Sequence, residues 1–235
     1  MATKYGKLYL IPNFLGNGNV DFLPKFNLEI IHSIDEFIVE NEKPTRAFLK
    51  SVQSPIHQND FVFHFMGKHE DVRDFPSFLD SCLAGKNVGL ISDAGLPCVA
   101  DPGYQLVRLA HYKNIEVVPL VGFSSIMMAL MASGFNGQSF RFHGYLPHNE
   151  SHKKKKLQQA LSDLNHNETQ IFIETPYRNT ALIAELKKSF PGQTKLCVAV
   201  DLSLDTENIT TKALSDWADK EDLLHKRPAV FVLGL

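Results

Sequence analysis

Short apolar runs alternate with amphipathic stretches along the first half of the chain. The runs lie at residues 8–11, 37–40, 60–65, 88–91 and 116–119, and each predicts a strand. Residues 72–84 and 104–112 carry apolar side chains at three- and four-residue spacing, which is typical of helices that bury one face. Strand–helix alternation favours a mostly parallel sheet covered by helices on both faces. We therefore expect an α/β domain over residues 1–121.

The pattern changes after residues 134–137, and the segments of a second α/β unit follow. Strands are expected at residues 140–144, 169–174, 195–201 and 228–234, and helices at residues 153–164 and 179–189. Residues 120–132 open a further helix, with Ser124 or Ser125 near its N-terminus. We place the second α/β domain at residues 122–235.

The loop at residues 92–103 is the most informative segment, because it contains two Asp, two Gly and two Pro directly after a predicted buried strand. A polar, glycine-bearing loop at the carboxyl end of a parallel strand is where open α/β sheets bind ligands. Gly95 and Gly103 permit backbone angles or close approaches that a Cβ would block. Asp101 and Pro102 are predicted to be an N-cap and the first residue of the next helix. An ordinary strand-to-helix connection is the alternative interpretation.

Composition excludes several classes of protein. The net charge of −2 and the isoelectric point near 6.5 leave no overall basic field for nucleic acid, so any RNA contact must be local. No apolar run approaches the roughly 20 residues of a membrane span, and no signal peptide is expected. Cys82, Cys98 and Cys197 are odd in number and far apart, which argues against a disulfide framework or a zinc cluster. We expect a cytoplasmic protein without a bound metal.

Few side chains stand out as acid–base catalysts. The chain contains no nucleophile elbow, Walker loop, GxGxxG motif or metal-ligand spacing. Asp93 and Asp101 could act as paired carboxylates, although capping and loop hydrogen bonds explain them more simply. The four lysines at residues 153–156 predict either a solvated helix face or a patch for a polyanionic substrate. A site made of loop backbone suits group transfer from an activated cofactor, and the catalytic residue stays unassigned.

Four motifs in a fixed order resemble the tetrapyrrole methylase family, the class III methyltransferases. They are Pro12 with Leu15-Gly16-Asn17, Ser92-Asp-Ala-Gly-Leu-Pro97 with Asp101-Pro-Gly103, Pro119-Leu-Val-Gly-Phe-Ser-Ser125, and Glu174-Thr-Pro-Tyr-Arg178. Within the family, the chain is most similar to the branch that 2′-O-methylates a cytidine of small-subunit ribosomal RNA. The resemblance runs from about Lys7 to Leu235.

This resemblance implies two α/β domains, an N-terminal one with a mostly parallel sheet and a C-terminal one with a mixed sheet. It also implies S-adenosylmethionine bound in the cleft between them, a homodimer, and ribosomal RNA or the small ribosomal subunit as partner. The implied cofactor contacts are Leu15, Asp93, Leu96, Ser125, Ile126, Phe172, Ala199 and Pro228. The implied residues on the acceptor side are Glu40, Arg46 and Arg178.

Two segments depart from the pattern of that branch. Its first loop reads Thr-Pro-Ile-Gly-Asn, whereas this chain has Asn13-Phe-Leu-Gly-Asn17. Its Glu-Asp-Thr-Arg segment is replaced by Glu40-Asn-Glu-Lys43, although Thr45-Arg46 still fits. Two alternatives to the RNA methyltransferase therefore stay open. One is a methyltransferase of a small corrin-like tetrapyrrole, and the other is a protein that binds the cofactor without catalysis.

Overall fold

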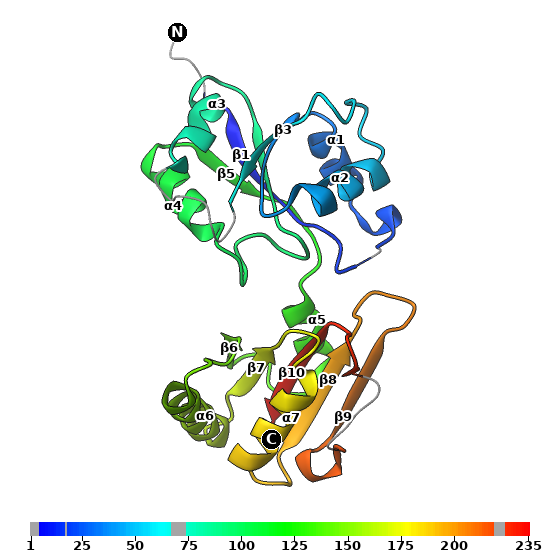
Figure 1. Ribbon diagram of the computed structural model, residues 1–235, viewed down its shortest axis with the longest axis vertical. Coiled ribbons are helices and arrows are strands. Elements are labelled where there is room, and N and C mark those ends of the chain that lie inside the picture. The colour runs from blue at the N-terminus through cyan, green and yellow to red at the C-terminus, as the bar shows by residue number, and fades with distance from the viewer. Residues whose placement is uncertain (1–4, 17, 67–73, 219–223) are drawn as a thin grey trace. The chain divides into compact units, whose positions relative to one another are not determined.

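The computed structural model describes residues 5–16, 18–66, 74–218 and 224–235. The chain divides into two compact units, Met1–Phe123 and Ser124–Leu235. The sequence placed this division two residues earlier, between residues 121 and 122. Each unit has its own sheet and its own core. Figure 1 labels most of the helices and strands of both units.

Unit 1 is built on a five-stranded sheet in which every pair of neighbouring strands is parallel. Its strands are β1 (Lys7–Ile11), β2 (Glu36–Val39), β3 (Val62–Phe65), β4 (Val88–Ile91) and β5 (Glu116–Pro119). Their order in the sheet is β3-β2-β4-β1-β5. All residues of β2 and β4 are buried, as expected of central parallel strands. The predicted parallel sheet is confirmed.

Helices pack on both faces of this sheet. They are α1 (Lys25–Ile31), α2 (Glu42–Ser51), α3 (Asp80–Leu83) and α4 (Tyr104–Tyr112), with short 3₁₀ helices η1 (Val20–Phe22) and η3 (Ser77–Leu79). Phe37 and Val39 of β2 join a core with α1 and α2, whereas Ile38 joins a second core with α3 and α4. Because successive side chains of a strand point to opposite faces of the sheet, β2 contributes residues to both cores.

The helix predicted at residues 72–84 is wrong in extent. Residues 72–73 lie outside the described part of the chain, and the remainder contains η3 and the single turn of α3 in place of one continuous helix. Pro76 directly precedes η3, and proline cannot donate the backbone hydrogen bond that a continuous helix requires at that position.

Unit 2 contains a mixed sheet, which confirms the predicted fold class. Its strands are β6 (Phe140–Gly144), β7 (Thr169–Ile173), β8 (Lys195–Val200), β9 (Asn208–Ala213) and β10 (Ala229–Gly234). Their order is β6-β7-β10-β8-β9, and only β6 and β7 are parallel neighbours. The helices are α5 (Ser125–Ser133), α6 (Glu150–Asn165), α7 (Asn179–Ser189) and the 3₁₀ helix η4 (Leu214–Asp216).

The two faces of the second sheet are covered by different helices. Phe172, Val198 and Phe231 are partners across three strands, and they share a core with residues of α6 and α7. Helix α5 contacts β8, β9 and β10.

In the described part of the chain, none of the helices has the length and apolar character to cross a membrane. All three cysteines are free thiols.

Candidate cofactor site

The candidate site of unit 1 lies where the parallel strands end. Loops follow β1, β4 and β5, which are adjacent in the sheet, so the three loops leave from one edge. The connection from β1 to β2 and the connection from β4 to β5 run in opposite directions across the sheet. Such a reversal is the usual place for a ligand in an open α/β sheet.

Asn13 joins the loop after β1 to the loop after β4. Its main-chain N–H donates to Gly95 O at 2.9 Å, and Gly95 N–H donates back to Asn13 O at 3.1 Å. The Asn13 side chain is buried, and its Nδ2 donates to Ser92 O and Asp93 O, both at 3.1 Å. Its Oδ1 accepts a hydrogen bond from Phe14 N at 2.8 Å. Four hydrogen bonds of Asn13 therefore hold the two loops together, and the fifth fixes its side chain within its own loop.

Asp101 organises the second half of the loop at residues 92–103. Its carboxylate accepts hydrogen bonds from Cys98 N at 2.9 Å and from Gly103 N at 2.7 Å. The prediction that Asp101 caps the next helix is wrong, because Gly103 is the N-cap residue of α4 and Asp101 closes the turn before it. Burial raises the pKa of the Asp101 carboxyl, and the two N–H groups oppose that rise. Loop hydrogen bonding therefore accounts for Asp101.

Asp93 is exposed and belongs to the same loop. Its Oδ2 accepts a hydrogen bond of 2.6 Å from Asn41 Nδ2, and Asn41 lies just after β2. The loop after β2 is thereby joined to the loop after β4. In the sequence, Asn13 and Asn41 stand out only as departures from a motif, which indicates no role for either. Both bond Asp93 in the structure.

Two glycines mark places where the loops approach closely. Gly95 has a φ of +68°, and a Cβ added there would lie 3.2 Å from Leu15 Cδ2. At Gly122, in the loop after β5, an added Cβ would lie 2.2 Å from Pro12 and 3.7 Å from Leu96 Cδ2. Leu15 and Leu96, both half-buried, therefore lie beside these glycines. The arrangement combines apolar side chains, main-chain polar groups and one exposed carboxylate.

Helix α5 begins unit 2 with the two serines that the sequence singled out. Ser124 is its N-cap, and the Ser124 Oγ accepts a hydrogen bond from Met127 N at 3.3 Å. This confirms the predicted helix start. Ser125 is half-buried and Ile126 is buried. The first-turn N–H groups of a helix suit polar ligand atoms.

Phe172, Ala199 and Pro228 lie near one end of the strands of the second sheet. At that end β7 and β8 finish and β10 begins, since β10 runs antiparallel to both. Asp201 N donates to Pro228 O at 3.0 Å at this end. The Phe172 side chain shares a face with Val198, so it points to the face opposite Ala199. It is fully buried and stacks on the His143 ring at 4.5 Å. Only the main chain of Phe172 remains for a ligand.

Among the residues expected on the acceptor side, Arg46 is engaged within its own unit. Its Nε forms a 2.6 Å ion pair with Glu42 Oε1, and its Nη1 donates to Gln58 O. Its guanidinium also lies 4.7 Å from the centre of the Phe63 ring. Glu40, the residue after β2, is half-buried. The structure therefore gives Arg46 a role in holding α2 to the segment before β3.

Arg178 precedes α7 and is more accessible than Arg46. Its Nη2 pairs with Glu174 Oε2 at 3.2 Å, and its Nη1 lies 3.2 Å from His148 Nδ1. The neighbouring Tyr177 is 80% exposed, and Lys226 Nζ lies 5.9 Å from the centre of the Tyr177 ring. An exposed aromatic ring with a lysine beside it and an arginine next in the chain is a surface that suits bases and phosphates.

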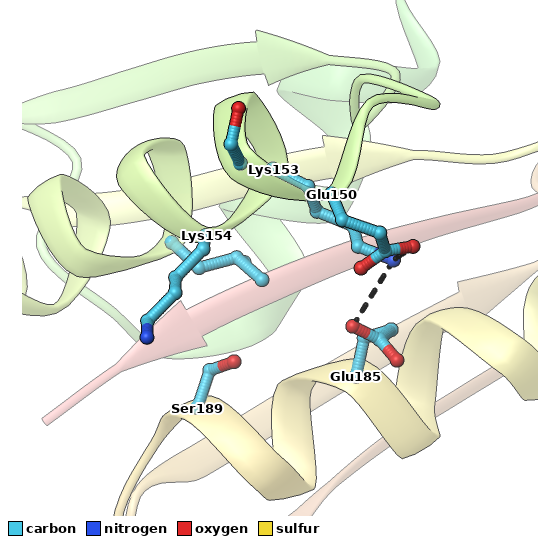
Figure 2. A pocket seen from close by; sticks show the side chains of 7 residues that line it. Glu150, Lys153, Lys154, Glu185 and Ser189 are labelled. Carbon is cyan, nitrogen blue, oxygen red and sulfur yellow. Dashed lines mark hydrogen bonds and ion pairs between the residues drawn. The ribbon is translucent and has the colours of Figure 1, made fainter.

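The four lysines at residues 153–156 do not form one free basic face. Lys153 bridges Glu150 Oε1 at 2.8 Å and Glu185 Oε2 at 3.3 Å, and Figure 2 shows the ion pair that joins α6 to α7. Lys156 Nζ donates to the carbonyls of His143 and Tyr145, and burial lowers its pKa. The other two lysines are exposed. The groove in Figure 2, about 430 Å³, is lined by residues of α6 and α7 and by none of the expected cofactor residues.

Comparison with known proteins agrees with this fold. The profile of the Tetrapyrrole (Corrin/Porphyrin) Methylases matches residues 7–218. A "Ribosomal RNA small subunit methyltransferase I" of Vibrio cholerae is 29% identical over 229 residues, which are 96% of this chain and 76% of the relative. A protein of the same name from Synechocystis is 32% identical over 199 residues, covering 84% of this chain and 67% of the relative.

Solved structures show the same fold at low sequence identity. Uroporphyrin-III-C-methyltransferase from Thermus thermophilus superposes with a TM-score of 0.59 at 17% identity, covering 97% of this chain and 92% of that one. A cobalt precorrin-4 methyltransferase gives 0.62 at 14% identity, covering 97% and 94%. Together with the family profile, which spans both units, these matches confirm the resemblance seen in the motifs. The chain belongs to the tetrapyrrole (corrin/porphyrin) methylase family and is a methyltransferase.

Proposed function

We propose that the protein transfers a methyl group from S-adenosylmethionine to a 2′-oxygen of small-subunit ribosomal RNA. The observation that carries the proposal is the cross-linked pair of loops at the carboxyl edge of the first sheet, built from the family motifs around residues 12–17 and 92–103. The choice of ribosomal RNA is supported by relatives that bear that substrate in their names and align over most of this chain.

The residues at these loops fit S-adenosylmethionine. A nucleoside needs apolar walls and directed polar groups, and Leu15, Leu96 and the loop carbonyls offer both. A sulfonium cation is favoured by nearby carbonyl oxygens and carboxylates, and Asp93 is the exposed carboxylate of this loop. The positive φ of Gly95 and the close approach at Gly122 keep backbone, rather than side chains, at the surface of the loops.

The proposal assigns further cofactor contacts to unit 2. Ser125 and Ile126 would contribute from the first turn of α5, and Ala199, Pro228 and the main chain of Phe172 from the end of the second sheet where β10 begins. The bound cofactor supplies a methyl group already activated on a sulfonium sulfur. The chain's own residues would then bind and orient the two reactants and exclude water, which is where most of the rate gain of such a transfer arises.

The acceptor side of the proposal includes Glu40, Arg46 and Arg178. Of these, Arg178 carries the expectation of phosphate contact, because Tyr177 and Lys226 extend the same exposed surface. Arg46 would act by holding α2 in place. We also propose that the protein works in the cytoplasm as a homodimer, and sedimentation at micromolar concentration tests the dimer directly.

Methyl transfer itself is the deciding experiment. Small ribosomal subunits from a strain that lacks the gene are incubated with the protein and radiolabelled S-adenosylmethionine, and the RNA is digested to nucleosides. Label in a 2′-O-methylated nucleoside supports the proposal. Label in a tetrapyrrole substrate but not in RNA overturns it in favour of the small-molecule reaction. Cofactor binding without transfer to either acceptor identifies a protein that binds S-adenosylmethionine without catalysis.

A further inference from the structure

Asp93 is held at two points by two asparagines from different loops. Asn13 Nδ2 donates to the Asp93 main-chain oxygen at 3.1 Å, and Asn41 Nδ2 donates to the Asp93 carboxylate at 2.6 Å. The first bond fixes the backbone at Asp93, and the second fixes the direction of its side chain. Among the described residues, the other carboxylate oxygen, Oδ1, has no hydrogen-bond partner.

The orientation of Asn13 follows from its surroundings. Both acceptors near its Nδ2 are carbonyl oxygens, and the donor near its Oδ1 is the N–H of Phe14. Rotating the amide would place oxygen against oxygen and N–H against N–H, so only one arrangement satisfies the buried side chain. Asn13 is therefore a rigid support for the backbone at Asp93.

The Asn41 side chain bonds Asp93 in place of the usual N-cap hydrogen bond. It occupies the N-cap position of α2, where an asparagine side chain ordinarily accepts a hydrogen bond from the first turn. No such bond forms at Asn41, and its amide points to Asp93 instead. An amide can donate to a carboxylate, whereas an aspartate at the same place would bring a second negative charge to within hydrogen-bonding distance.

We infer that Asn41, supported by Asn13, is a positioning residue that aims the free oxygen of Asp93 at a hydrogen-bond donor or positive charge of S-adenosylmethionine. The inference rests on the proposed cofactor site and adds to it the reason why Asp93 points in one direction. It also assigns a function to the loop after β2, which would otherwise lie outside the cofactor site.

Calorimetric titration with S-adenosylmethionine tests the inference through the Asn41→Asp variant. At about pH 8 two ionised carboxylates repel, Asp93 turns away, and the affinity falls about tenfold relative to the wild type. At a lower pH, where the two carboxyls share one proton, the contact returns and most of the affinity is regained. If Asn41 served only to stabilise the loop, the ratio of the variant's affinity to the wild-type affinity would not change with pH.

Exchanging the two side chains separates orientation from packing. The double variant Asn41→Asp, Asp93→Asn restores an amide–carboxylate hydrogen bond but moves the charge to position 41. The inference expects binding as weak as in Asp93→Asn alone, whereas full recovery in the double variant would show that the pair serves only to join the loops. Asn149→Asp makes the same chemical change at the N-cap of α6, and it should leave the affinity unchanged.

The outcomes distinguish the inference from the proposed function. Wild-type protein that fails to bind S-adenosylmethionine overturns the proposed function and the inference with it. Wild-type binding together with equal binding by Asn41→Asp at both pH values overturns the inference alone. If Asn41→Asp does not melt cooperatively, Asn41→Ala replaces it. Loss of the donor should then weaken binding about threefold or more at both pH values, and undiminished binding contradicts the inference.

Discussion

Asn13 and Gly95 pair main chain to main chain in an antiparallel bridge that lies outside both sheets. Residues 82 positions apart thereby form one continuous backbone surface at the end of β1 and β4. The bridge requires a positive φ at Gly95, so the local conformation of a single glycine supports the contact between the two loops.

Replacing Gly95 with Val should weaken cofactor binding and destabilise unit 1. A branched side chain is disfavoured at a φ of +68°, and its Cβ would lie 3.2 Å from Leu15 Cδ2. We expect a loss of about 1–2 kcal/mol in the free energy of unfolding and at least a roughly tenfold loss of affinity for S-adenosylmethionine. Urea unfolding and calorimetry measure the two effects.

Gly137→Val is the matched control for that variant, because an added Cβ at Gly137 meets nothing within 4 Å. It should change neither quantity appreciably. A folded Gly95→Val protein with wild-type affinity would remove the loop at residues 92–103 from the cofactor site.

Arg178 and Arg46 should respond differently to removal of their charge. If Arg178 contacts an RNA phosphate, Arg178→Ala should reduce the slope of log affinity against log salt by about 0.7. Arg46→Ala should leave that slope unchanged and instead lower stability, since Arg46 bonds Glu42 and Gln58 and packs on Phe63. Filter binding across a salt series and thermal melting separate the two effects.

The exposed Lys25 on α1 provides the reference for a charge change outside the proposed surface. An Arg178→Ala protein with the same salt slope as Lys25→Ala would argue against RNA contact at Arg178.

The buried carboxylate of Glu36 should make stability depend on pH. Burial raises its pKa, but hydrogen bonds from His64, Ser81 and Lys86 outweigh burial and hold the pKa below its usual value. Because its pKa is lower in the folded protein, the Glu36 carboxylate stabilises the fold at pH values above the pKa of a glutamate in the unfolded chain, about 4.3. This stabilisation is lost as the pH falls through the lower pKa of the folded state.

Glu36→Gln should accordingly lower the free energy of unfolding by about 1–3 kcal/mol at neutral pH. The difference from the wild type should shrink below about pH 4. Asp35→Asn is the neighbouring control, because the Asp35 side chain is 42% exposed and pairs only with Lys86 among the described residues. A constant difference between Glu36→Gln and wild type at every pH would contradict this account.

The thiol of Cys98 should resist alkylation although it lies in the exposed loop region. Burial and the nearby Asp101 carboxylate raise its pKa to about 12. Because only the thiolate reacts, iodoacetamide at about pH 8 should modify it about a thousandfold more slowly than an unperturbed cysteine. Mass spectrometry of the native protein measures the rate, and the same protein in denaturant gives the reference. Rapid native labelling at Cys98 would show that the loop opens.

Much of the fold could be predicted because its central strands are short, apolar and regularly spaced. The five strands of unit 1 and four of the five strands in unit 2 match apolar runs. β9 was missed, because Asn208, Thr210 and Lys212 make one of its faces polar, Thr211 interrupts the other, and none of its residues is fully buried. α2 was also missed. It contains Pro44, which a helix tolerates only in its first turn, where the N–H has no partner in the helix.

The candidate site could be located from its motifs, but its internal bonding could not. Gly95 and the loop at residues 92–103 follow from strand position and from glycine and proline content, whereas the assignment of Asp93 came from the resemblance to the family. The contacts of Asn13 and Asn41 with Asp93 join loops that are far apart in the sequence, and no local pattern indicates which amide meets which carboxylate. The burial of Phe172 was equally inaccessible, since it depends on the register across β7, β10 and β8.

The polarity that concealed β9 has a protective consequence. β9 forms one edge of the second sheet, and an edge strand offers unpaired N–H and C=O groups to any other extended chain. A lysine within such a strand must be desolvated before another strand can pair with it, and Lys212 also lies 4.2 Å from the centre of the Trp217 ring. Unwanted sheet extension, and the aggregation that follows from it, is therefore disfavoured at this edge.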